Sequence, residues 1–120
     1  MPTRALRGAI TADRNDAESI LEATEELVRE LMRSNALDPA DLISCIFTCT
    51  PDLNAEFPAV AARNVGLSSV PLLCAQEIAV PDSLPRVIRV MVHCELGAEA
   101  PNHVYLRDAR QLRRDLEGAQ

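Results

Sequence analysis

Arginines stand inside apolar stretches of this chain, so the fold has to bring each guanidinium to a partner. Arg7 lies in Ala-Leu-Arg-Gly-Ala-Ile, Arg89 lies in Val-Ile-Arg-Val-Met-Val, and Arg113 follows shortly after His-Val-Tyr-Leu. A guanidinium keeps its proton, so burying it is costly unless an anion or several acceptors meet it. These arginines are candidates for an anion-binding pocket, and Arg7 with Arg89 would suit a dicarboxylate. The alternative for Arg89 alone is an edge-strand side chain whose head reaches water.

The size and charge of the chain narrow the class of protein. A chain of 120 residues is expected to form one domain, residues 1–120, around a single core. The net charge of −6 and an aromatic content of 2% argue against a nucleic-acid-binding module. All twelve basic residues are arginine, which excludes a Schiff-base or phosphate-loop lysine. With 48% hydrophobic residues, we expect a partner subunit to cover part of the surface.

The residues that usually carry metal, redox or nucleophilic chemistry are not arranged for it. The four cysteines contain no Cys-x-x-Cys pair, and the two histidines have no metal-ligand spacing, so we expect reduced thiols and no metal site. There is no Gly-x-Ser-x-Gly elbow and no glycine-rich phosphate loop. No segment resembles a signal peptide or a membrane span, which predicts a soluble, cytoplasmic protein.

The hydrophobic periodicity predicts an α+β domain with a mixed β-sheet that one long helix covers on one face. The long helix is expected at about residues 16–34, with Asn15 as its N-cap and Glu18 three residues later. A short helix is expected from Pro58 to Val65. The expected strands are 5–10, 42–49, 70–74, 86–94 and 103–106. We expect the strands 70–74 and 86–94 to pair as neighbours.

Several short motifs occur in order along the chain, and together they resemble one family. They are Arg-Gly-Ala-Ile-Thr from Arg7, Thr-Pro-Asp-Leu from Thr50 with Phe57-Pro58-Ala59 and Arg63, Val-Pro-Leu-Leu-Cys-Ala-Gln-Glu from Val70, Ile-Arg-Val-Met from Ile88, and His-Val-Tyr-Leu from His103 with Leu112-Arg113. In this combination the chain resembles the AroH class of trimeric, monofunctional chorismate mutases. Val60 and Arg114 depart from the pattern of that class.

The resemblance implies a pseudo α/β-barrel homotrimer with an active site at each subunit interface. It implies an isomerase, an intramolecular transferase that converts chorismate to prephenate in the shikimate pathway towards phenylalanine and tyrosine, without a cofactor. Catalytic roles would fall on Arg89, Glu77 and Arg7, with Arg7 and Tyr105 on a substrate carboxylate and Cys74 and Glu77 on the ring hydroxyl. Phe57, Ala59 and Arg63 would form a wall from the neighbouring subunit, Leu73 and Leu112 would complete the apolar lining, and Arg113 would lie near the mouth.

Two other functions remain open at this point. An imine or enamine deaminase uses a similar trimeric fold, so the fold alone does not decide between the two enzymes. A non-catalytic regulator could use Arg7 and Arg89 to clamp a carboxylate ligand without turning it over. The set of Arg7, Glu77, Arg89 and Tyr105 favours the mutase.

Overall fold

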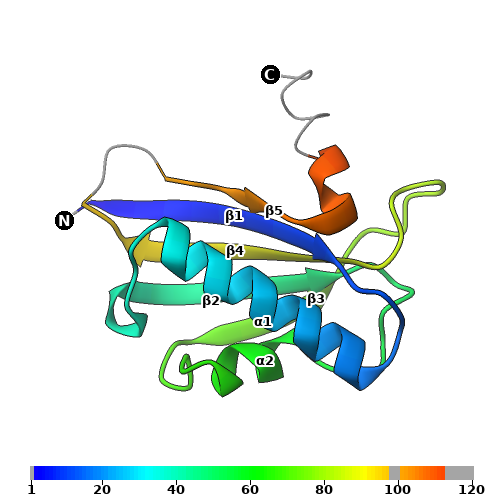
Figure 1. Cartoon of the computed structure of the whole chain (residues 1–120), viewed down its shortest axis with the longest axis horizontal. Coiled ribbons are helices and arrows are strands. Elements are labelled where there is room, and N and C mark those ends of the chain that lie inside the picture. Colours follow the sequence, from blue (N-terminus) through cyan, green and yellow to red (C-terminus); the bar gives the residue numbers. More distant parts are fainter. Residues whose placement is uncertain (1, 98–100, 113–120) are drawn as a thin grey trace.

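The computed structural model describes residues 2–97 and 101–112 and contains a mixed five-stranded sheet with helices on one face (Figure 1). The elements in chain order are β1 (Thr3–Thr11), α1 (Ala17–Ser34), the 3-10 turn η1 (Pro39–Asp41), β2 (Leu42–Cys49), α2 (Pro58–Asn64), β3 (Leu72–Gln76), β4 (Val87–Glu95), β5 (Val104–Tyr105) and the 3-10 turn η2 (Arg107–Ala109). The α+β class and the mixed sheet are confirmed. No helix of the described residues is long and apolar enough to cross a membrane.

The strands lie in the order β3-β2-β4-β1-β5. β4 is antiparallel to both β1 and β2, whereas β2 with β3 and β1 with β5 form parallel pairs. The expected pairing of residues 70–74 with 86–94 is therefore wrong, because β2 lies between them. β4 is long and largely buried, which suits an interior strand, whereas β3 is short with exposed residues and takes the edge.

Alternation along the strands gives the sheet a core face and an open face. Ile88 and Val90 of β4 are buried on the face that α1 covers, together with Leu6 and Ile10 of β1 and Phe47 of β2. Helices α1 and α2 contact each other and lie on this same side (Figure 1). Side chains of the opposite parity, including Arg7 and Arg89, therefore point to the other face.

Helix α1 and its N-cap each begin one residue later than expected. The N-cap is Asp16, whose carboxylate accepts a hydrogen bond from the backbone N–H of Ser19 at 2.7 Å. This bond, with a further one from the Arg14 side chain, lowers the pKa of Asp16 to about 2. Asn15, the expected cap, instead accepts hydrogen bonds from the backbone N–H groups of Asn54 and Ala55. Both residue types cap well, so the sequence spacing could not separate them.

The strand ends also differ from the expected ranges. β1 extends beyond residues 5–10, because Thr3 still pairs with Glu95 and Thr11 with Val87. β3 begins only at Leu72, since the backbone N–H of Val70 is used in a turn with the carbonyl of Leu67. The last strand is shorter than expected and contains only Val104 and Tyr105.

Gly8 allows α1 to pack directly on β1. A Cβ at this position would lie 2.8 Å from Leu31 Cδ1, 3.1 Å from Leu27 Cδ1 and 3.2 Å from Val90 Cγ1. Gly8→Val would force these core side chains apart, so we expect it to lower the free energy of unfolding by about 1–3 kcal/mol. Urea unfolding at fixed protein concentration measures the change. Ala5→Val is the control, because Ala5 is exposed on the same strand, and an equal loss in both variants would contradict the packing argument.

Candidate active site

A cleft of about 470 Å³ opens on the face of the sheet that the helices leave uncovered. Five of the residues singled out in the sequence line it, namely Arg7, Glu77, Arg89, Tyr105 and Leu112. Its volume lies in the range of small-molecule binding sites. The cleft therefore combines two cations, a carboxylate and a phenol with apolar walls.

The register of β1 and β4 brings the two arginines together. Arg7 pairs with Met91, and Arg89 pairs with Ala9, so the arginines are diagonal neighbours on one face. Such positions lie about 7–8 Å apart at their Cα atoms, within reach of long side chains. Arg89 lies on an interior strand, so the alternative of an edge-strand arginine is wrong. Its side chain is nevertheless 45% exposed, because the cleft opens above it.

Glu77 follows the end of β3 and points its carboxylate into the cleft. Its backbone N–H donates to the carbonyl of Cys49 at 2.8 Å, which extends the pairing of β3 with β2. The Thr48 hydroxyl donates to Glu77 Oε2, and Arg89 Nε lies 3.6 Å from the same oxygen. The carboxylate is 24% exposed and is held by both partners. It therefore fixes the Arg89 side chain and still offers its other oxygen to a ligand.

A small apolar cluster supports the end of the cleft that contains Tyr105 and Leu112. Ala9, Val87 and Ala109 form its buried centre, and Leu84, Tyr105 and Leu112 pack against it. This cluster is separate from the main core beneath α1. The position of Tyr105 and Leu112 therefore depends on how η2, which contains Ala109, is held against β1.

The other predicted site residues lie outside this cleft. Phe57 and Cys74 line a second hollow of about 390 Å³ between the α2 entry and β3. Leu73 is exposed on β3 and Arg63 is exposed on α2, whereas Ala59 is buried in the core. Arg113 lies outside the described residues. Within one chain the described site residues therefore form two sets. The first set lines the cleft, and the second set lies outside it.

Six cleft residues were missed by the sequence reasoning. Gly8, Ala9 and Val90 are buried, whereas Ile46, Thr48 and Met91 present partly exposed side chains to the cleft. A signal for these last three was present, because side chains two positions apart on a strand share a face. Met91 is two residues after Arg89, and Ile46 and Thr48 alternate with the buried Cys45 and Phe47. The prediction of a strand at residues 42–49 did not assign its two faces, so this alternation was overlooked.

The cysteines are free thiols. Burial, as the main cause, raises the pKa of Cys45 to about 11 and that of Cys49 to about 12, and it also raises the pKa of Cys94. No group of three His, Cys, Asp or Glu side chains suited to hold a metal ion occurs within residues 2–97 and 101–112. The cleft therefore offers binding and electrostatic groups rather than a reactive thiolate.

Comparisons with known proteins assign this chain to a family. The family model for chorismate mutase type I matches residues 3–116. The chorismate mutase AroH of Thermus thermophilus is 47% identical over 98% of each chain, and that of Bacillus subtilis is 39% identical over 97% of this chain and 94% of its own. A chorismate mutase structure from Clostridium thermocellum superposes with a TM-score of 0.88 at 45% identity, covering 90% of this chain and 98% of its own.

The chain therefore belongs to the type I family of chorismate mutases. It is an isomerase that converts chorismate to prephenate in the biosynthesis of aromatic amino acids. The resemblance to the AroH class in the sequence motifs is thereby confirmed.

Thiol reactivity tests the burial of the cysteines. A thiol reacts as its thiolate, so burial and a raised pKa slow modification of Cys45, Cys49 and Cys94. Cys74 is only half-buried. We expect Cys74 to be the fastest of the four thiols with iodoacetamide at pH 8, as measured by peptide mass spectrometry. A fast phase that persists in Cys74→Ser would contradict this expectation.

Proposed function

We propose that the chain catalyses the rearrangement in the cleft on the open face of the sheet, by positioning and electrostatic stabilisation without covalent catalysis. In this reaction a carbon–oxygen bond breaks as a carbon–carbon bond forms within one molecule, so no nucleophile, metal or proton relay is needed. The protein has to select the folded conformer of chorismate and stabilise negative charge that develops on the ether oxygen. The observation that carries the proposal is the pair of diagonal arginines in an apolar cleft.

Arg89 is the proposed partner of the ether oxygen. Its backbone is fixed by strands on both sides, and Glu77 restrains its side chain, so the guanidinium is arranged before the substrate arrives. Arg7 and Tyr105 lie on the adjacent strands β1 and β5 and would hold a carboxylate. Glu77 would accept a hydrogen bond from the ring hydroxyl, and Leu112 would cover the apolar side of the ring.

We further propose a homotrimer, closed as a pseudo-barrel, in which a neighbouring copy completes each site. Phe57 is 66% exposed and Leu73 is 61% exposed, which is unusual for large apolar side chains in a chain that acts alone. Both belong to the second set of residues outside the cleft, together with the exposed Arg63 and the half-buried Cys74. Ala59 of this set is buried and would support the wall from beneath. Placed against the cleft of a neighbour, this set would supply the missing wall and bring Cys74 of one subunit towards Glu77 of another.

We also propose a cytoplasmic location, and the four free cysteines are consistent with a reducing compartment. Arg113 would lie near the mouth of the site, as the resemblance implies.

Removal of Arg89 tests the catalytic assignment. Arg89→Ala should lower the kcat for chorismate by at least about a hundredfold, because a preorganised donor to the developing charge is lost. Arg89→Lys should recover little of it, since an ammonium lacks the two-pronged guanidinium geometry. The measurement is the disappearance of chorismate with prephenate identified as the product.

The matched control is Arg29→Ala, which removes an exposed arginine from α1 on the other face of the sheet. An equal loss in both variants would contradict the role of Arg89. Turnover of an imine substrate without chorismate turnover, or binding of a chorismate analogue without turnover, would favour the deaminase or the regulator instead.

Mixing two inactive variants tests the shared site. Arg89→Ala disables the cleft, and Arg63→Ala disables the wall that the neighbour supplies. If each site draws its two halves from different subunits, an equal mixture refolded together should recover about one quarter of the wild-type activity, because one interface in four pairs two intact halves. Absence of recovery, with Arg63→Ala inactive alone and trimers formed, would contradict the shared site.

A further inference from the structure

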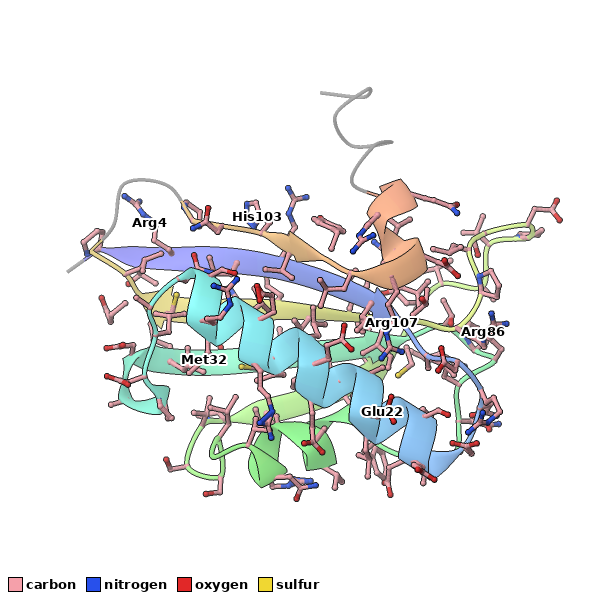
Figure 2. The ribbon with its side chains drawn as sticks, in the orientation of Figure 1. Arg4, Glu22, Met32, Arg86, His103 and Arg107 are labelled. Atoms are coloured by element: carbon pink, nitrogen blue, oxygen red, sulfur yellow. The ribbon has the colours of Figure 1, made fainter. Side chains whose placement is uncertain are left out.

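Arg107 joins the turn η2 to β1 and α1 through several contacts at once. Its guanidinium donates to the carbonyl of Thr11 at 3.2 Å and to Glu26 Oε1 at 2.8 Å. Asp13 Oδ1 lies 3.6 Å away and Glu22 Oε1 lies 3.7 Å away. Figure 2 shows Arg107 near the end of β1, between η2 and the half of α1 that contains Glu22. Single surface ion pairs contribute little, but one arginine shared among several carboxylates can hold a segment.

The backbone of Arg107 adopts a conformation that an arginine rarely takes. Its φ is +55°, in the left-handed region that disfavours residues with a Cβ other than Asn and Asp. Such a conformation persists only where surrounding contacts hold it. The side chain is 25% exposed, so the guanidinium is partly withdrawn from water among its partners. The contacts of the side chain are therefore what offsets the cost of the backbone.

The segment that Arg107 fixes carries one wall of the cleft. Immediately before it, the backbone N–H of Leu106 donates to the carbonyl of Ala9, next to Tyr105. Immediately after it, the backbone N–H of Asp108 donates to the Thr11 hydroxyl, and Ala109 is fully buried against Ala9 and Val87. Tyr105 and Leu112 pack on this same small cluster.

We propose that Arg107 is a positioning residue for substrate binding, which holds Tyr105 and Leu112 in place by anchoring η2 to Thr11 and to the acidic face of α1. The proposal rests on the proposed site, in which Tyr105 and Leu112 contact the substrate. Arg107 itself points away from the cleft, towards α1, and touches no reacting atom. Its loss would therefore loosen the wall and leave the Arg89–Glu77 arrangement intact.

The test compares Arg107→Asn with Arg29→Gln. Asn adopts the left-handed region more readily than other residues with a Cβ, so Arg107→Asn removes the anchor without adding backbone strain. Arg29→Gln removes an arginine of α1 whose ion pair with Glu25 stays within the helix. Glu26→Gln weakens the same contact from the α1 side, because Glu26 accepts a hydrogen bond from Arg107. This variant replaces Arg107→Asn in the test if Arg107→Asn does not fold.

We expect Arg107→Asn to raise the KM for chorismate about tenfold while kcat changes less than about threefold, since binding contacts are displaced and the stabilising cation is not. Hydrogen exchange at the amides of Asp108 and Ala109 should accelerate at least about tenfold, with β1 and β4 still protected. Arg29→Gln should change neither quantity. Adding Glu26→Gln to Arg107→Asn should produce no further rise in KM, because the two residues act through one contact.

Kinetic constants of Arg107→Asn within twofold of the wild type would overturn the proposal, whether or not exchange accelerates. A fall in kcat with unchanged KM would also overturn it. The variants Tyr105→Phe and Leu112→Ala distinguish an error in the role of Arg107 from an error in the proposed substrate site. Wild-type kinetics in both of these variants would overturn the site assignment, whereas a raised KM in them with normal kinetics in Arg107→Asn would overturn only the role of Arg107.

Discussion

The pairing of β4 with strands on both sides is the constraint on which core and site both depend. Its even-numbered residues, including Ile88 and Val90, are buried in the core, whereas Arg89 and Met91, of the opposite parity, line the cleft. A slip of one residue would exchange the two sets and bury the Arg89 guanidinium, at a cost of several kcal/mol. The burial of apolar side chains therefore also fixes which side chains of β4 face the cleft. The register that the core demands thus also sets the face on which the Arg89 backbone presents its side chain.

The charges of the cleft act against the charge of the whole chain. The net charge is −6, yet the cleft presents Arg7 and Arg89 against the single carboxylate of Glu77. Glu77 reduces the local positive charge, but its ion pair also holds the Arg89 side chain from one side. A rearrangement that develops negative charge at one atom gains more transition-state stabilisation from a cation held in place than from a mobile cation in a more positive site. Thr48 contributes in the same way, because its hydroxyl holds the carboxylate that holds the arginine.

Much of the fold and part of the site could be predicted from the sequence. The expected ranges located each strand and helix, because β2 and β4 are apolar runs and the apolar residues of α1 recur at the helical period. The predicted pairing of β3 with β4 was wrong, because strand order depends on long-range packing that a local sequence pattern does not contain. Arg7 and Arg89 could be predicted as cleft residues because they are arginines within apolar stretches. Thr48 and Met91 are ordinary strand residues, so only the structure identified them as part of the cleft. The second set, from Phe57 to Cys74, was named only through the family resemblance.

Two arginines outside the cleft, Arg86 and Arg107, find their acceptors at the end of β1. Arg86 and Arg107 both have left-handed backbones, with φ values of 55° each, and their guanidinium groups donate to the carbonyls of Ala12 and Thr11. A guanidinium needs acceptors, and here backbone oxygens supply them in place of a substrate anion. Arg86 immediately precedes the strand that carries Arg89, and Arg107 begins the turn between Tyr105 and Leu112. The end of β1 is thus held from both sides by cations that lie outside the cleft. Their acceptors lie far away along the chain, so the sequence around each arginine does not reveal these contacts.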